Sequence, residues 1–274
     1  AGNSTIQNVT NNAYFVRRLA GREDIPIYSG ASRPLVREPV LAVVHGESGL
    51  DGAVVNHEAE LDGRAVEKII EIVGDSPGEV SLLVLGPQTN IARAIKKAPE
   101  VMRRVKQLVI MGGAFTVSGN KNAVAEFNIC VDPEAAAIVA AFEVPKVYIP
   151  LDVCNAIQVP LSKFEAITPA TIRGVLVAMM KPYIHNLNFD ELETKGALMY
   201  DVLAAYVLLF PDRCQTEKAH VQVETKGELT YGMTLVDRRL SQRGATPNAE
   251  IVTSIPQEDF ETVFFDTLNS FDET

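Results

Sequence analysis

Three side chains able to bind hydroxyl groups lie within nine residues of one another. Asn120, Glu126 and Asn128 bring two amides and a carboxylate into the run 119–133, a combination that suits a hydroxyl-rich ligand. In an extended backbone, Glu126 and Asn128 would point to the same side. A second interpretation is a polar loop leading into a helix, with Asp132 as N-cap and the following proline at the first helical position. The run alone leaves both interpretations open.

A parallel sheet would position these side chains. Three short runs of mainly Val, Ile and Leu, at 80–85, 108–111 and 147–151, are typical of strands buried on both faces. The stretches between them favour helices, at 90–105 with a break at its proline and at 133–142. Alternating strands and helices give right-handed βαβ units. We therefore predict an α/β fold with an open, mostly parallel, Rossmann-like sheet and helices on both faces.

Patterns elsewhere predict further elements. Helices are expected at 5–19, 64–73, 169–187, 199–209 and 260–271, and strands at 25–28, 220–224, 229–236 and 251–255. The pair 220–224 and 229–236 would form a small antiparallel C-terminal hairpin attached to the main sheet. Because no linker or repeat divides the chain, we expect one domain over residues 1–274.

The polar residues gather at one rim of the predicted sheet. In open parallel sheets, ligands bind beyond the carboxyl ends of the strands. Those ends lead into 86–90, into 111–113 followed by 120–128, and into 151–152. The run that contains Glu126 is therefore expected to lie beside two other loops at this rim. This placement favours a binding site over a plain loop.

Composition and charge exclude several functional classes. The net charge of −10 argues against nucleic-acid binding, which needs clustered Lys and Arg. Three cysteines and four histidines, all widely spaced, form neither a disulfide framework nor a zinc pattern. An oxygen-only site for Ca²⁺ or Mg²⁺ remains open. The sequence has no Walker motif, no Gly-x-Ser-x-Gly elbow, no signal peptide and no membrane-length apolar run, so we expect a cytoplasmic protein that binds no membrane.

Four motifs in a fixed order resemble those of a known family. They are His45-Gly46-Glu47-Ser48-Gly49-Leu50-Asp51-Gly52, Leu85-Gly86-Pro87-Gln88-Thr89-Asn90-Ile91-Ala92, Met111-Gly112-Gly113-Ala114, and Ala125-Glu126-Phe127-Asn128 with Asp132-Pro133-Glu134-Ala135. Together they look like nucleoside hydrolases of the inosine–uridine-preferring type, through about Asp201. The resemblance implies a Ca²⁺-dependent enzyme that cleaves the N-glycosidic bond of small ribonucleosides into ribose and free base. It also implies a homodimer or homotetramer.

The resemblance assigns roles to individual residues. The ribose would be contacted by Asn3, Met111, Asn120, Glu126 and Asn128. The Thr89 backbone carbonyl and the Asp201 carboxylate would bind Ca²⁺, and His45 would lie near the nucleobase. Without the resemblance, Met111 suits a buried core, His45 a loop, and Asp201 a helical first turn, where the helix dipole favours an acid. The sequence does not choose between purine and pyrimidine bases.

One departure from the family pattern concerns the metal. The family's aspartate-rich first motif, which supplies two Ca²⁺ carboxylates and the catalytic base, has no counterpart in the 274 residues. We expect a first strand–helix unit, on the order of 30 residues, to be absent from this sequence. Taken by itself, the chain is then expected to bind Ca²⁺ poorly and to hydrolyse nothing. The alternative function is that of a non-catalytic riboside-binding or scaffold protein of the same fold.

A second departure concerns the proton that the leaving base needs. Tyr200 stands where many relatives have a histidine credited with protonating that base. A tyrosine with a pKa of about 10 is a weaker acid at neutral pH. Another group, such as His185 or Tyr183, would then donate the proton, although His185 also suits a helix surface. The candidate catalytic side chains are Tyr200, His45 and His185.

Overall fold

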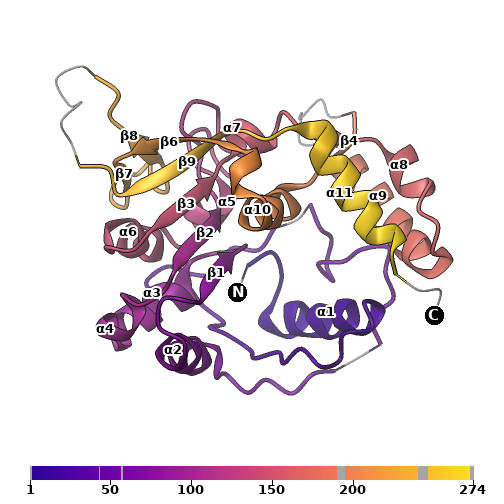
Figure 1. Cartoon of the computed structure of the whole chain (residues 1–274), viewed down its shortest axis with the longest axis horizontal. Helices are drawn as coiled ribbons and strands as arrows, with labels where there is room; N and C mark the ends of the chain where they lie inside the picture. The colour runs from indigo at the N-terminus through magenta and orange to yellow at the C-terminus, as the bar shows by residue number, and fades with distance from the viewer. Residues whose placement is uncertain (1, 43, 57, 190–194, 240–245, 272–274) are drawn as a thin grey trace.

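The computed structural model describes residues 2–42, 44–56, 58–189, 195–239 and 246–271. Within them, a five-stranded sheet has the order β1-β2-β3-β9-β6 (Figure 1). Its strands are β1 (Ser81–Val84), β2 (Gln107–Met111), β3 (Lys146–Ile149), β9 (Ala249–Ser254) and β6 (Gln215–Ala219). The first four run parallel, and β6 pairs antiparallel with β9. The predicted α/β fold with an open, mostly parallel sheet is confirmed.

Side chains of the central strands alternate between two cores. On β2, Leu108 and Ile110 belong to one core, while Val109 and Met111 belong to the other. A sheet covered on both faces requires this alternation of apolar side chains. Helices contributing to the first core are α2 (Ala65–Asp75), α3 (Thr89–Lys97), α4 (Pro99–Met102) and α6 (Pro133–Ala141), and those contributing to the second are α7 (Leu151–Cys154), α8 (Leu161–Glu165), α9 (Ala170–Phe189), α10 (Tyr200–Leu209) and α11 (Gln257–Asn269). No helix among the described residues is both long and apolar enough to cross a membrane.

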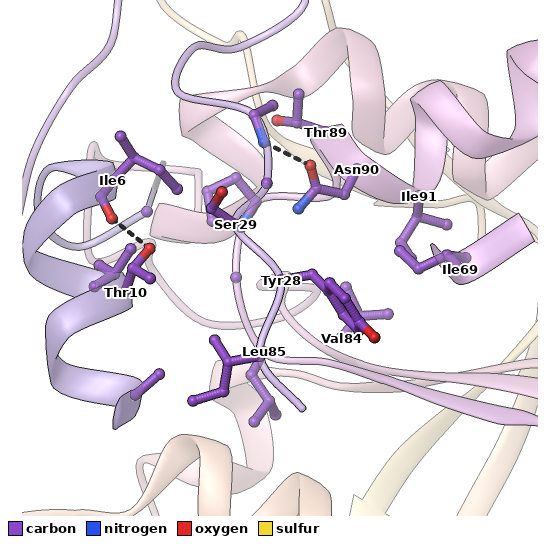
Figure 2. A pocket seen from close by; sticks show the side chains of 18 of the residues that line it. Ile6, Thr10, Tyr28, Ser29, Ile69, Val84, Leu85, Thr89, Asn90 and Ile91 are labelled. Atoms are coloured by element: carbon purple, nitrogen blue, oxygen red, sulfur yellow. Dashed lines mark hydrogen bonds between the residues drawn. The ribbon is translucent and has the colours of Figure 1, made fainter. Parts of the chain in front are cut away.

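The expected strand at 25–28 is absent. This segment has no strand assignment and lies, together with α1 (Ile6–Leu19) and β1, around a cavity of about 370 Å³ (Figure 2). Just beyond it, the Ala31 backbone N–H donates to Asn90 Oδ1 at 2.9 Å and holds the chain against α3. Apolar residues predict a strand here, but a ladder also needs a partner strand at hydrogen-bonding distance. β1 ends the five-stranded sheet without pairing to this segment.

The C-terminal strands differ from the prediction in their pairing. β7 (Val221–Val223) and β8 (Thr234–Val236) form an antiparallel pair, but in a two-stranded sheet of their own. The strand that joins the main sheet is β6, which the sequence analysis missed because its exposed edge position allows the polar sequence Gln-Thr-Glu-Lys-Ala. A further small sheet pairs β4 (Gln158–Val159) with β5 (Ala197–Leu198), and the short helix η1 (Pro211–Arg213) precedes β6.

A buried carboxylate joins three segments near the carboxyl end of the sheet. Asp132 is 0% exposed, and its Oδ1 accepts a hydrogen bond from the Ala135 backbone N–H at 3.1 Å, so the predicted N-cap of α6 is confirmed. Its Oδ2 accepts from the Thr89 hydroxyl at 2.6 Å and from the Leu35 backbone N–H at 2.9 Å. Asp132 therefore fixes the first residue of α3 and the connection between α1 and α2 relative to α6.

Replacing this carboxylate is expected to destabilise the fold. Asp132→Ala removes a helix cap and leaves two donors without their partner, so we expect the free energy of unfolding to fall by about 4 kcal/mol. Urea unfolding followed by circular dichroism measures the change. Asp75→Ala, at the exposed end of α2, is the control and should change that free energy by less than about 0.5 kcal/mol. Equal effects of the two substitutions would contradict the role of Asp132.

Candidate active site

The run 119–133 is folded around the carboxylate of Glu126. Glu126 is the N-cap of α5 (Phe127–Val131), and its Oε1 accepts a hydrogen bond from the Asn128 backbone N–H at 2.8 Å. Its Oε2 accepts from the backbone N–H groups of Ile129 and Gly113, both at 3.2 Å. The backbone is extended at Glu126 itself and helical from Phe127 onward, because the carboxylate accepts from free N–H groups of the first helical turn.

Glu126 is a buried acid whose ionisation falls near neutral pH. The residue is 2% exposed. Burial raises its pKa to about 7, its three backbone donors act in the opposite direction, and the charge of Asp201 raises it further. In the described part of the chain, no salt bridge links Glu126 or Asp201 to a basic side chain. Two neighbouring acids of this kind suit a ligand that brings hydroxyl donors or positive charge.

Tyr200 and Asp201 open α10 close to Glu126. Asp201 lies in the first turn of this helix and keeps contact with solvent, yet the protein atoms around its carboxylate desolvate it and raise its pKa to about 6. Burial also raises the pKa of Tyr200, and the charge of Glu126 acts in the same direction. These groups therefore lie within electrostatic range of one another.

His45 joins this group through Tyr183. The two rings are stacked, with centroids 5.4 Å apart and an interplanar angle of 7°. The Tyr183 hydroxyl donates to the Leu198 backbone carbonyl at 3.0 Å, which holds the ring in place. Burial lowers the pKa of His45, so its imidazole is neutral at neutral pH. Flat, neutral rings beside the two acids suit a planar heterocycle.

Asn128 and Met111 are buried together at the end of β2. Asn128 Nδ2 donates to the Met111 backbone carbonyl at 3.2 Å and lies 3.2 Å from its sulfur, Sδ. Met111 is 2% exposed and belongs to the core that includes α10. Its burial agrees with the core interpretation, and its contact with a sugar stays a prediction.

Comparison with known proteins identifies the family. The family described as inosine-uridine preferring nucleoside hydrolase matches residues 1–262. The chain belongs to this family. The predicted family and enzyme class are thereby confirmed, since a nucleoside hydrolase cleaves ribonucleosides.

Similar proteins agree over nearly the whole chain. An uncharacterised Schizosaccharomyces pombe protein is 39% identical over 98% of this chain and 88% of its own length. A pyrimidine-specific ribonucleoside hydrolase of Citrobacter koseri is 35% identical over 95% of this chain and 84% of its own. Among solved structures, a purine-preferring ribonucleoside hydrolase from Gardnerella vaginalis matches with a TM-score of 0.88 and 26% identity, covering 98% of this chain and 88% of that one.

For three residues assigned to the nucleoside hydrolase site, the structure gives contacts or positions outside the group around Glu126. Asn3 precedes α1, and its backbone carbonyl accepts from the Ala42 N–H at 3.0 Å. The Thr89 hydroxyl is engaged with Asp132. His185 is exposed on α9, and its separation of two residues from Tyr183 turns it roughly 200° around the helix axis. The site roles of these three residues stay predictions.

Asn155 is a residue of this site that the sequence analysis missed. It directly follows α7 and accepts a hydrogen bond from the Tyr200 hydroxyl through Oδ1 at 3.2 Å. The available signal was its position, because the rim segment 151–152 continues through one helical turn to this amide. Its partner on α10 lies 45 residues further along the chain, a contact that local pattern does not reveal.

The described residues contain no cluster of acidic side chains that could hold a calcium ion. Ca²⁺ takes about six to eight oxygen ligands. No group of three or more His, Cys, Asp or Glu side chains within the described ranges could hold a metal ion. The Asp201 carboxylate and the Thr89 carbonyl have the right donor chemistry but fall short in number. These residues therefore do not by themselves fit a calcium ion.

The raised pKa of Glu126 predicts a pH dependence of stability. Its pKa is 4.5 for the ordinary group and about 7 in the folded protein. As pH rises from 4.5 to 7, the unfolded chain releases this proton first, so the free energy of unfolding falls, by on the order of 3 kcal/mol. Glu126→Gln should remove that loss, while Glu165→Gln at an exposed position should keep it. Urea unfolding across this pH range in EDTA measures the difference, and identical slopes in both variants would contradict the prediction.

Proposed function

We propose that this protein hydrolyses the N-glycosidic bond of ribonucleosides, with the ribose held at the run 119–133. The observation that supports it best is the buried Glu126 carboxylate in electrostatic range of Asp201, at the carboxyl end of the parallel sheet of a nucleoside hydrolase. Carboxylates accept hydrogen bonds from sugar hydroxyls, and side-chain amides both accept and donate them. The residues assigned to the ribose are Asn3, Met111, Asn120, Glu126 and Asn128.

The charge of the site suits the transition state of this reaction. As the bond between C1′ and the base nitrogen lengthens, positive charge develops on the ribose ring in an oxocarbenium-like state. Ionised Glu126 and Asp201 would stabilise that charge, since negative groups held in place beforehand act on positive charge that develops beside them. Water bonds to C1′, and the glycosidic electron pair leaves with the base.

The nucleobase would lie against the aromatic side of the site. The stacked rings of His45 and Tyr183 offer a flat surface beside the two acids. Relatives named pyrimidine-specific and a structural neighbour named purine-preferring differ in their base. An assay of base release from this protein therefore needs both uridine and inosine as substrates.

We assign the calcium ligands of the family to the Asp201 carboxylate and the Thr89 carbonyl. These two donors are fewer than the six to eight or so oxygens that Ca²⁺ takes, so the 274-residue chain should bind the ion weakly. No step of the reaction is derived through the ion. A single domain over 1–274, a cytoplasmic location and a homodimeric or homotetrameric state stay predictions.

Product analysis tests the proposed function. Incubation with inosine or uridine should release ribose and free base in equal amounts, and EDTA should stop the release. In the 274-residue chain alone, we expect riboside binding but release at least roughly a hundredfold slower than in a form with a complete calcium site. Release that EDTA does not change would contradict the calcium assignment. Failure of both binding and release would contradict the proposed function.

The alternative, a non-catalytic riboside-binding protein, is favoured by one observation. Among the described residues, no group of three or more His, Cys, Asp or Glu side chains could hold a metal ion. This alternative predicts that inosine binds, while no form of the protein releases base with or without calcium.

Calcium titration tests the assignment of Asp201. Asp201→Ala should weaken Ca²⁺ binding at least about tenfold, because the substitution removes the one carboxylate assigned to the ion. Cys154→Ala is the matched control from the same neighbourhood, and its thiol is not an oxygen ligand. Calorimetry with millimolar calcium measures both affinities. Equal losses in the two variants would contradict the assignment.

A further inference from the structure

The hydroxyl of Tyr200 interacts with two side-chain amides. It donates to Asn155 Oδ1 at 3.2 Å. The second amide is that of Asn120, whose orientation is set by the Phe127 backbone N–H, which donates to Asn120 Oδ1 at 2.8 Å. With this oxygen engaged, the Nδ2 hydrogens of Asn120 are the groups left for Tyr200.

This arrangement commits the only hydrogen of the Tyr200 hydroxyl. A phenolic hydroxyl has one O–H to donate and lone pairs that accept. The hydrogen points to Asn155, so the oxygen presents a lone pair, and not a proton, to its other neighbours. Asn155 is itself anchored, because its backbone N–H donates to the Leu151 carbonyl at 3.0 Å at the end of α7.

We propose that Asn155 is a positioning residue that holds Tyr200 as a hydrogen-bond acceptor toward the substrate, so that the leaving base receives no proton from Tyr200. The inference rests on the proposed function. In the cleavage step, water oxygen bonds to C1′ and the C1′–N electron pair leaves on the base. Solvent takes the proton of the attacking water, and the departed base takes its proton from solvent.

The leaving group distinguishes an acid from a positioning residue. A leaving group that is stable as an anion needs no acid, whereas a basic leaving group gains most from one. p-Nitrophenyl β-D-ribofuranoside leaves as a stabilised phenolate, so it is the reference substrate for comparison with inosine and uridine. The comparison concerns the leaving group alone, because all three share the same ribose.

A double-mutant cycle on inosine binding tests the positioning role. Tyr200→Phe and Asn155→Ala should each raise the dissociation constant of inosine, measured by calorimetry, by roughly three- to tenfold. In the Tyr200→Phe background, Asn155→Ala should add less than about a twofold change, because the shared hydrogen bond is already gone. Asn269→Ala, whose amide accepts from Thr168 away from this site, is the control. If the dissociation constant in the double variant rises by the product of the two single effects, the positioning role is overturned.

Turnover of the three ribosides tests the leaving-group part. Turnover is measured in whichever hydrolyses faster, the 274-residue chain or a form with a complete calcium site. Tyr200→Phe should change kcat for p-nitrophenyl riboside, inosine and uridine by the same factor, within about threefold. A loss of about thirtyfold or more for uridine with p-nitrophenyl riboside unchanged would identify Tyr200 as the acid and overturn the inference. Absence of both inosine binding and turnover would instead contradict the proposed function.

Discussion

The capping of α5 by the buried Glu126 carboxylate is the interaction on which the site depends. Glu126 accepts hydrogen bonds from Gly113, just beyond β2, and from the first turn of α5, so one side chain sets the geometry between the sheet and the run 119–133. The burial that allows these bonds also raises its pKa to about 7. The carboxylate proposed to contact the ribose therefore also holds this part of the structure together, and the charge of Asp201 raises its pKa further.

Much of the fold could be predicted from sequence because burial on both faces leaves a strong pattern. The apolar runs of β1, β2 and β3 and the helix α6 lie within a residue or two of their predicted bounds, and α3 and α4 lie within three residues of the predicted stretch 90–105. Errors fall where pairing depends on a distant partner. Residues 25–28 look like a strand but have no ladder, and β6 is polar but pairs with β9. The conformation of α5 was missed because a side-chain cap, and not periodicity, creates that helix.

The site could be predicted in part, through motifs rather than contacts. Resemblance to nucleoside hydrolases located the run with Glu126 and the helix that Asp201 opens, and the structure brings these two acids into electrostatic range. It gave no sign of Asn155, which meets Tyr200 only after α7 and α10 have packed together. For Thr89, the motif predicted a role for the backbone carbonyl but not the hydrogen bond from its hydroxyl to Asp132.

We propose that a ribose lies against Glu126 with its base on the side of His45 and Tyr183. A crystal structure of the protein with inosine bound would test this placement. We expect ribose hydroxyls at hydrogen-bonding distance, about 3 Å, from Glu126 and Asn120, with the hypoxanthine ring facing the His45–Tyr183 stack. Inosine bound elsewhere, for example in the cavity between α1 and β1, with the Glu126 carboxylate left without a ligand contact, would contradict it.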